Sequence, residues 1–168
     1  MLKDNAVMWR ALVRMPVSLW GVWVSLNVTS SSNEKTEKGL FFCIVGARFD
    51  AHDFAGDAIN NGCVALIVEH WVGLNVPQVL VSNGRAAMAR ITEAFFGYPG
   101  RQMKLVGLTG TKGKTTTTYL LKSIVEKAGM KCGLIGSTGS MIGDKHLDGN
   151  LTTPDPIDMQ RTLRQMAD

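Results

Sequence analysis

The sequence predicts an α/β protein in which one small α/β domain is followed by the beginning of a second. Short apolar runs alternate with segments of helical periodicity over most of the chain. A segment with turn chemistry throughout, Gly97-Tyr98-Pro99-Gly100, separates the two halves. With 168 residues and 45% hydrophobic content, the chain can bury a core. We therefore expect an unplaced segment at 1–27, a first domain at 28–100 and the first part of a second domain at 101–168.

The N-terminal segment carries basic residues ahead of an apolar run at 15–26, which is the order found in a secretory signal. The run is shorter than the roughly 20 residues that cross a bilayer, and no small-residue cleavage site follows it. Its second half, 22–28, alternates loosely between apolar and polar residues, as a strand does. We expect a cytoplasmic protein that does not act on a membrane.

The first domain is expected to alternate strands and helices. Apolar runs predict strands at 40–45, 64–68 and 78–81, and helical spacing predicts helices at 54–61 and 85–96. The pair Asn61-Gly62 is a stop signal for the first of these helices. Ser82 or Asn83 is the candidate cap of the second.

The second domain is expected to begin with a strand at 104–108, a loop at 109–113 and a helix at 114–128. Gly129 is placed to end that helix, and residues 132–135 can return as a parallel strand through a right-handed crossover. A hairpin-like stretch at 140–150 follows. Pro156 then lies in the first turn of a last helix.

Charge and cysteine content narrow the possible partners. Lys and Arg number 18 against 14 Asp and Glu, a net charge of +4, and the basic residues are scattered rather than clustered. We expect no nucleic-acid partner; a mildly basic surface suits an anionic small substrate or plain solvation. The three cysteines, Cys43, Cys63 and Cys132, form no metal or disulfide pattern and are expected to be reduced thiols, with Cys43 and Cys63 beside apolar runs.

The segment Gly107–Thr116 resembles a phosphate-binding loop. Glycines at 110 and 113 allow backbone N–H groups to face an anion, and a helix that begins at Lys114 adds the positive end of its dipole. The Lys114 ammonium can reach terminal phosphates, and the Thr115 hydroxyl can bind Mg²⁺. The predicted ATP site comprises Gly110, Thr111, Lys112, Gly113, Lys114, Thr115 and Thr116.

One position departs from the general phosphate-loop pattern. The pattern places a glycine five residues before Gly113, whereas this chain has Leu108 there and Gly107 one place earlier. An ordinary glycine turn between a strand and a helix is the alternative interpretation. The flanking apolar run and amphipathic helix favour the phosphate loop, because they supply the context in which that loop works.

The same residues resemble the nucleotide loop of the Mur ligases, which typically reads Thr-Gly-Thr-Asn/Lys-Gly-Lys-Thr-Thr and also lacks that glycine. Segments 46–54 and 95–99 resemble the UDP-sugar-binding N-terminal domain of the MurE type. Segments 134–139 and 152–154 resemble the start of its central ATPase domain. The resemblance covers roughly residues 28–168, so it implies a small UDP-binding α/β domain followed by the start of a P-loop Mur-ligase central domain.

This resemblance implies an ATP- and Mg²⁺-dependent ligase of peptidoglycan synthesis. Such an enzyme joins an amino acid, commonly meso-diaminopimelate or L-lysine, to UDP-N-acetylmuramoyl-L-alanyl-D-glutamate through an acyl-phosphate. By position, Lys114 would be catalytic and Thr115 would bind Mg²⁺. The UDP-muramoyl substrate would contact Ser30, Ser32, Ala47, Arg48, Phe49, Thr152 and Thr153. Arg48 also suits a solvated surface position, and Thr152-Thr153 also suits a helix cap.

Two positions depart from the family pattern of the sugar site: Ser31-Ser32-Asn33 replaces an Asp-Ser-Arg triplet, and Ala51 replaces a glycine. The family's later metal ligand, its carbamylated lysine and its C-terminal domain have no counterpart in this sequence. We therefore expect a monomeric fragment without ligase activity of its own. The alternatives are a MurF-type ligase, a folylpolyglutamate-synthase-like ligase, and a nucleotide-binding module without ligase chemistry.

Overall fold

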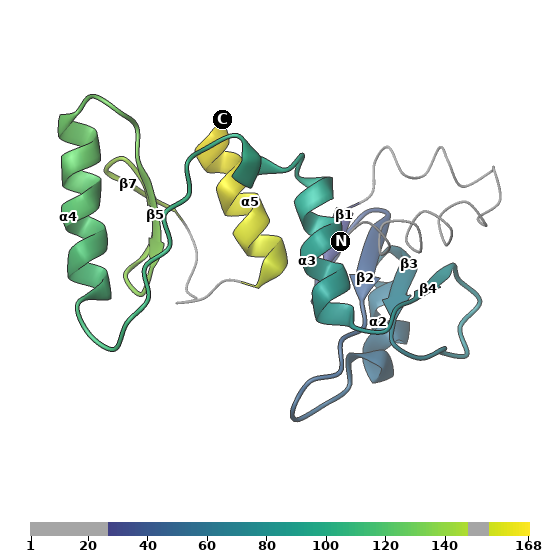
Figure 1. Ribbon diagram of the computed structural model, residues 1–168. Helices are drawn as coiled ribbons and strands as arrows, with labels where there is room; N and C mark the ends of the chain where they lie inside the picture. The colour runs from purple at the N-terminus through teal and green to yellow at the C-terminus, as the bar shows by residue number, and fades with distance from the viewer. Residues whose placement is uncertain (1–26, 148–154) are drawn as a thin grey trace. The chain divides into compact units, whose positions relative to one another are not determined.

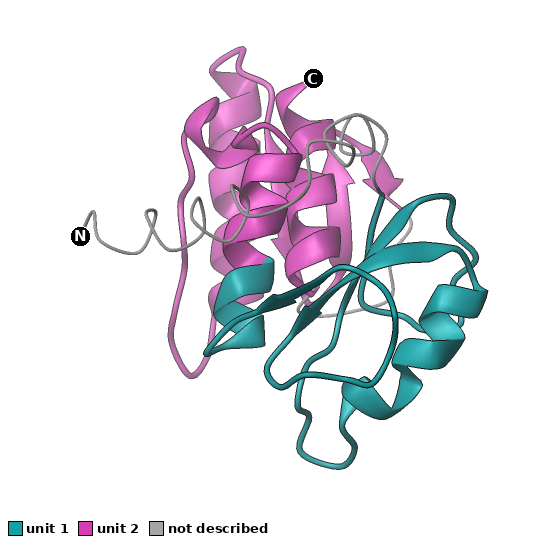
Figure 2. Ribbon diagram, turned by 90° about the vertical axis from the view of Figure 1, so that its right-hand side faces the viewer, with its two compact units in different colours: residues 1–88 teal, residues 89–168 magenta. Residues whose placement is uncertain are grey.

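The computed structural model of the protein describes residues 27–147 and 155–168 (Figure 1). The chain divides into two compact units, Met1–Met88 and Ala89–Asp168, which Figure 2 shows in separate colours. Both units combine helices with strands, so the predicted α/β class is confirmed. Thr152, Thr153 and all of the N-terminal segment before Asn27 lie outside the described residues.

Unit 1 contains a four-stranded parallel sheet (Figure 1). Its strands are β1 (Asn27–Thr29), β2 (Gly39–Phe42), β3 (Cys63–Val68) and β4 (Gln78–Leu80), and they lie in the order β1-β2-β3-β4. Every neighbouring pair is parallel. The loops that follow the strands therefore all leave the sheet at the same edge.

The core of unit 1 lies between this sheet and the helix α2 (Ala55–Asn60). Phe41, Cys43, Leu66 and Val68 pack there with Ala55 and Ala58, and all six are at most 1% exposed. Residues 40, 42, 65 and 67 alternate onto the other face of the sheet and are buried as well, as expected for a parallel sheet.

The helix predicted at 54–61 is confirmed as α2, and a separate 3₁₀ helix, η3 (Ala51–Phe54), precedes it. The stop signal Asn61-Gly62 is also confirmed. Gly62 has a φ of 101°, and a side chain there would begin 1.9 Å from the carbonyl oxygen of Thr36, so only glycine fits this turn.

The helix α3 (Gly84–Phe95) begins at the expected position. Asn83 is its cap, because the Asn83 side-chain oxygen accepts a hydrogen bond from the backbone N–H of Ala86 at 2.9 Å. The turn-forming segment after α3 contains Gly97 and Tyr98 with positive φ and leads into a short 3₁₀ helix, η4 (Pro99–Arg101).

Unit 2 contains α4 (Lys114–Lys127), a three-stranded sheet and α5 (Pro156–Ala167). The sheet is an antiparallel meander of β5 (Gly133–Gly136), β6 (Gly139–Ile142) and β7 (Lys145–Leu147). Asp155 caps α5 by accepting the N–H of Asp158 at 2.9 Å, and Pro156 lies in the first turn as predicted. No helix in the described ranges is both long and apolar enough to cross a membrane.

Two predictions about unit 2 are wrong. Residues 104–108 form no strand, and Leu105 and Val106 are 59% and 76% exposed. The strand β5 pairs antiparallel with β6 rather than parallel with the 104–108 segment. A hairpin needs only a tight turn, whereas parallel pairing needs a long crossover and cover on both faces of the sheet.

The helix α4 has the expected bounds, but its apolar stripe is not buried. Leu120 is 60% exposed and Ile124 is 63% exposed, while the side chain of Lys122 is only 9% exposed. In the described part of unit 2, residues 104–108 do not form a strand of the sheet. The apolar side chains of α4 therefore have no strand at 104–108 to pack against.

The three cysteines should differ in reactivity. Burial raises the pKa of Cys43 to about 12 and the pKa of Cys63 to about 11, whereas Cys132 is partly exposed. At pH 8 we expect iodoacetamide to modify Cys132 at least about a hundredfold faster than either buried thiol, because the buried thiols hold far less thiolate. Peptide mass spectrometry over a time course measures this. Equal labelling of Cys43 and Cys132 in the folded protein would contradict the core described here.

Candidate functional site

The loop before α4 has the backbone geometry of an anion-binding turn. Gly110 has a φ of 148° and Gly113 a φ of 78°, and residues with side chains rarely adopt either value. Gly113 is the residue that caps α4, and its carbonyl accepts the N–H of Thr117 at 2.9 Å. The N–H groups of residues 114–116 precede this first helical bond, so they point out of the helix end with the positive end of its dipole.

Lys114 and Thr115 place their functional groups at this helix end. The ammonium of Lys114 lies over the loop and donates to the carbonyl oxygen of Gly110 at 2.5 Å. The hydroxyl of Thr115 lies 3.0 Å from the hydroxyl of Ser137. All residues from Gly110 to Thr116 are exposed, so the loop is open to a ligand.

The turn between β5 and β6 completes this site. Besides the contact between Ser137 and Thr115, the Thr138 hydroxyl lies 3.0 Å from the hydroxyl of Tyr119 on α4. Neither Ser137 nor Thr138 is predicted as a site residue from the sequence. The signal that could have found them is a pair of small hydroxyl residues between two glycines at the end of a predicted strand.

Lys122 on α4 contacts two carboxylates, one on its own helix and one in the meander. The ammonium of Lys122 donates to Glu126 at 2.7 Å and lies 3.6 Å from Asp144 in the turn between β6 and β7. The hydrogen bond to Glu126 raises the pKa of Lys122. The bond to Glu126 lies within α4, so of these two contacts only the longer one, to the exposed Asp144, joins the helix to the meander.

A second group of predicted site residues lies at the carboxyl edge of the sheet in unit 1. Ser30 and Ser32 follow β1, and the segment 47–49 follows β2, which is the parallel neighbour of β1. The Thr29 hydroxyl at the end of β1 donates to Glu34 at 2.6 Å, and the carbonyl of Ser32 accepts from the Asn61 side chain at 2.8 Å. Ligands of open parallel sheets bind at this edge.

The segment 46–49 forms a closed loop. Val45 and Asp50 form an antiparallel bridge at its base, and the N–H of Gly46 donates to the carbonyl of Phe49 at 3.0 Å. The Phe49 ring is 68% exposed and meets the Phe54 ring edge to face, with 6.4 Å between the ring centres. Ala47 and Arg48 are exposed at the tip of the loop.

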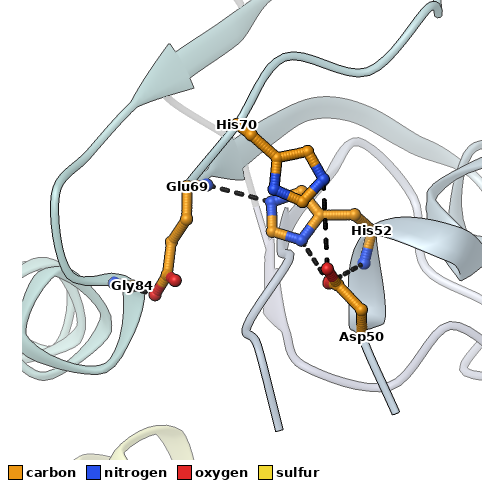
Figure 3. A network of polar contacts seen from close by, with 5 residues as sticks. All are labelled: Asp50, His52, Glu69, His70 and Gly84. Carbon is orange, nitrogen blue, oxygen red and sulfur yellow. Dashed lines mark hydrogen bonds and ion pairs between the residues drawn. The ribbon is translucent and has the colours of Figure 1, made fainter.

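A polar network joins this loop to the ends of β3 and α3 (Figure 3). Asp50 accepts the backbone N–H of His52 at 2.9 Å and lies 2.5 Å from the His52 ring nitrogen Nδ1. The other ring nitrogen, Nε2, lies 2.9 Å from the backbone N–H of Glu69. The Glu69 carboxylate in turn accepts the N–H of Gly84 at 2.6 Å. Sequence reasoning did not assign this network to a site, because its members lie far apart in the chain.

The hydrogen bonds of His52 indicate which ring nitrogen donates and which accepts. A backbone N–H can only donate, so Nε2 carries no proton and Nδ1–H donates to Asp50. The backbone N–H of His52, together with its ring, holds the pKa of the Asp50 carboxyl below its usual range.

His70 stacks on the His52 ring with 3.8 Å between the ring centres. Ligand atoms of Asp50, His52 and His70 lie within 4.8 Å of one another, which raises the possibility of a metal site. Both nitrogens of His52 already serve hydrogen bonds, and a neutral His52 that bound a metal through Nδ1 would direct an Nε2 proton at the Glu69 N–H. The arrangement fits a hydrogen-bonded network better than a metal centre.

The structure thus brings the predicted residues into two groups, each within one unit. Gly110 to Thr116 form one loop in unit 2, which Ser137 joins. Ser30, Ser32 and 47–49 share one edge of the sheet in unit 1. Thr152 and Thr153 are outside the described residues.

Residues 108–168 match the family described as the Mur ligase middle domain. Over 137 residues, the chain is 45% identical to the UDP-N-acetylmuramoyl-L-alanyl-D-glutamate–2,6-diaminopimelate ligase of Geobacillus thermodenitrificans, a match that covers 82% of this chain and 28% of that protein. The ligase of the same name from Aquifex aeolicus is 42% identical over 138 residues, which cover 82% of this chain and 29% of the relative.

Solved structures of the family share the fold. A crystal structure of MurF from Acinetobacter baumannii aligns over 82% of this chain and 27% of its own, with a TM-score of 0.55 and 27% identity. A UDP-N-acetylmuramoyl-L-alanyl-D-glutamate–2,6-diaminopimelate ligase structure aligns over 84% of this chain and 29% of its own, with a TM-score of 0.65 and 23% identity.

The chain spans 28% and 29% of the length of the two curated relatives. The aligned 137 residues are more than either compact unit contains, so the likeness extends over both units. The phosphate-type loop lies within the segment that matches the middle domain. The chain therefore belongs to the Mur ligase family.

Proposed function

We propose that this chain is part of an ATP-dependent ligase of the MurE type, which adds a diamino acid to UDP-N-acetylmuramoyl-L-alanyl-D-glutamate in the cytoplasm. The observation that carries the proposal is the glycine loop at the start of α4, with Lys114 and Thr115 at the helix end. The 45% identity to a 2,6-diaminopimelate ligase supports the substrate class.

In this proposal, unit 2 binds ATP through residues 110–116. The triphosphate accepts hydrogen bonds from the N–H groups at the start of α4, where the helix dipole favours an anion. The Lys114 ammonium, which lies over the loop, exchanges its bond to the Gly110 carbonyl for one to phosphate. Positive φ at Gly110 and Gly113, with open space around the Cβ position of Gly113, fits the close approach of phosphate oxygens.

The residues also fit Mg²⁺. The Thr115 hydroxyl and the Ser137 hydroxyl, 3.0 Å apart, are oxygen donors of the kind that Mg²⁺ accepts alongside phosphate oxygens and water. Thr115 would hold the ion, with Ser137 beside it. The ion would neutralise charge on the phosphates during transfer.

The reaction we propose joins an acid and an amine in two steps. A carboxylate oxygen of the muramoyl dipeptide attacks the γ-phosphorus of ATP, so that ADP leaves and an acyl-phosphate forms. The amine of the diamino acid then attacks the acyl carbon, and phosphate leaves as the amide bond forms. Lys114 stabilises negative charge on the transferred phosphate, the role for which a mobile point charge is suited.

In unit 1, the UDP part of the substrate is proposed to lie against the carboxyl edge of the sheet. Ser30 and Ser32 offer hydroxyls beside the loop 46–49, whose tip presents Arg48 for a diphosphate. The exposed Phe49 ring offers a flat apolar surface to the uracil base. Thr152 and Thr153 are proposed to contact the muramoyl end.

The relatives distinguish the alternatives. Those described above by curated name act on 2,6-diaminopimelate, which favours that amino acid over L-lysine. The MurF likeness reported above is to a solved structure at 27% identity, whereas both curated relatives reported above, at 45% and 42% identity, are named as ligases of the MurE type. A nucleotide-binding module without ligase chemistry would bind ATP but not UDP-N-acetylmuramoyl dipeptide, so binding of both ligands favours the ligase.

Replacing Lys114 tests the ATP site. Lys114→Ala should weaken ATP binding about tenfold to a hundredfold, because a charge-assisted contact to phosphate contributes about 1.5–3 kcal/mol. Isothermal titration calorimetry measures the change. Lys127→Ala, an equal loss of charge at the exposed far end of α4, is the matched control and should leave the affinity unchanged. Equal ATP affinity of Lys114→Ala and the natural chain would mean that the loop is not a working site.

Replacing Thr115 tests the magnesium ligand. Thr115→Val keeps the shape of the side chain but removes the oxygen, so Mg²⁺ should no longer strengthen ATP binding. The measurement compares the Kd of ATP with Mg²⁺ and with EDTA in both proteins. Thr118→Val, one turn further along α4, is the control, since the Thr118 hydroxyl bonds only to the carbonyl of Thr115 at 2.7 Å among the contacts described. A full magnesium effect in Thr115→Val would rule this residue out as a ligand.

A further inference from the structure

The loop 46–49 leaves the sheet after β2 and returns at Asp50. Its tip is exposed, and within it the N–H of Gly46 donates to the Phe49 carbonyl. A loop with so few internal bonds is held in place mainly at its base. The base is the bridge between Val45 and Asp50, and Asp50 is the residue through which the loop contacts the polar network of Figure 3.

The network continues from Asp50 through a buried histidine to the next strand. The His52 side chain is 2% exposed and uses both ring nitrogens, one toward Asp50 and one toward the Glu69 N–H directly after β3. A neutral imidazole is a donor at one nitrogen and an acceptor at the other, which is what the two partners require. The Asp50 side chain is 30% exposed and therefore lies at the border between this network and the open edge.

We propose that Asp50 and His52 form a latch that fixes the loop 46–49 to the carboxyl end of β3 and so positions it for the uridine nucleotide. The latch consists of the Asp50 carboxylate, the His52 ring and the Glu69 N–H. These are positioning residues, since the loop itself would touch the ligand. The inference rests on the proposed function of unit 1, because it takes the UDP moiety as the ligand of this edge.

The contacts around the latch agree with this role. The Glu69 carboxylate accepts the Gly84 N–H at 2.6 Å, so the strand end that receives His52 is itself tied to the start of α3. A Cβ at Gly84 would begin 2.8 Å from the same carboxylate oxygen, so the absence of a side chain at Gly84 gives the carboxylate room to reach this N–H. The charged or titratable groups that face the His52 ring are Asp50 and His70, and His70 lies on the solvent side with a 56% exposed side chain.

The test compares two substitutions of Asp50. Asp50→Ala removes the acceptor of both His52 bonds, whereas Asp50→Asn keeps a side-chain oxygen that can accept from the His52 backbone N–H or from Nδ1–H. We expect Asp50→Ala to bind UDP about tenfold more weakly and Asp50→Asn to recover most of that affinity. Asp53→Ala, an equal loss of charge at an exposed neighbour, is the matched control and should bind UDP as the natural chain does.

Hydrogen exchange of the ligand-free chain gives a second measurement. In Asp50→Ala, the amides of residues 46–52 should exchange faster, while those of β3 and α4 should not change. If Asp50→Ala does not fold, His52→Asn replaces it in both measurements. Its shorter amide can still donate to Asp50 but does not reach Glu69, so it should also loosen the loop and weaken UDP binding.

The outcomes separate the latch from the proposed function. If the natural chain binds neither UDP nor UDP-N-acetylmuramoyl dipeptide, the proposed ligand of unit 1 is wrong, and the exchange rates alone then show whether the loop is latched. If the natural chain binds UDP and Asp50→Ala binds it equally well, the latch is overturned. Stoichiometric binding of Zn²⁺ that Asp50→Ala and His70→Ala both abolish would also overturn it, because the three residues would then be a metal site.

Discussion

Parallel pairing of β1 to β4 is the constraint on which the proposed substrate edge of unit 1 depends. Because the four strands run the same way in chain order, Ser30, the loop 46–49 and Glu69 all follow strand ends at one edge of the sheet. The tight turn at Gly62 fits no larger residue, and β3 begins directly after it, paired in parallel with β2. A reversed strand would carry its following loop to the opposite edge and separate Asp50 from Glu69.

Unit 2 depends on a different constraint, the unsatisfied N–H groups at the start of α4. The residue that caps α4 is Gly113, which has a positive φ and no side chain that could bond to these N–H groups. The Lys114 ammonium adds a positive charge close to the same helix end. The meander brings the Ser137 hydroxyl to the same place, where it lies 3.0 Å from the Thr115 hydroxyl. The apolar stripe of α4 stays exposed in the described part of this unit.

Helix starts, caps and stops depend on residue types at a few neighbouring positions, and these could be predicted from the sequence. The start of α4 at Lys114, the cap at Asn83 and the stop at Asn61-Gly62 follow from residue types at fixed positions. The strand expected at 104–108 did not form, because an apolar run specifies a strand only where a neighbouring strand pairs with it. For the same reason, the sequence could not distinguish a hairpin of β5 with β6 from a parallel return.

The two candidate sites differ in how far sequence spacing groups their residues. The proposed phosphate loop is contiguous in sequence, so its residues could be proposed before the fold was known. The latch is not contiguous: His52 and the Glu69 N–H are 17 residues apart, and Glu69 and Gly84 are 15 apart. Ser137 reaches Thr115 across 22 residues through the turn of the meander, a contact that no spacing rule predicts.

The most direct test of the central claim, that residues 110–116 bind ATP, is a titration of the ¹⁵N-labelled chain with MgATP followed by backbone amide chemical shifts. The account predicts saturable shifts at Gly110 to Thr116 and at Ser137, with the Asp50 and Glu69 amides unmoved. Shifts confined to other residues, or none at millimolar MgATP, would contradict it.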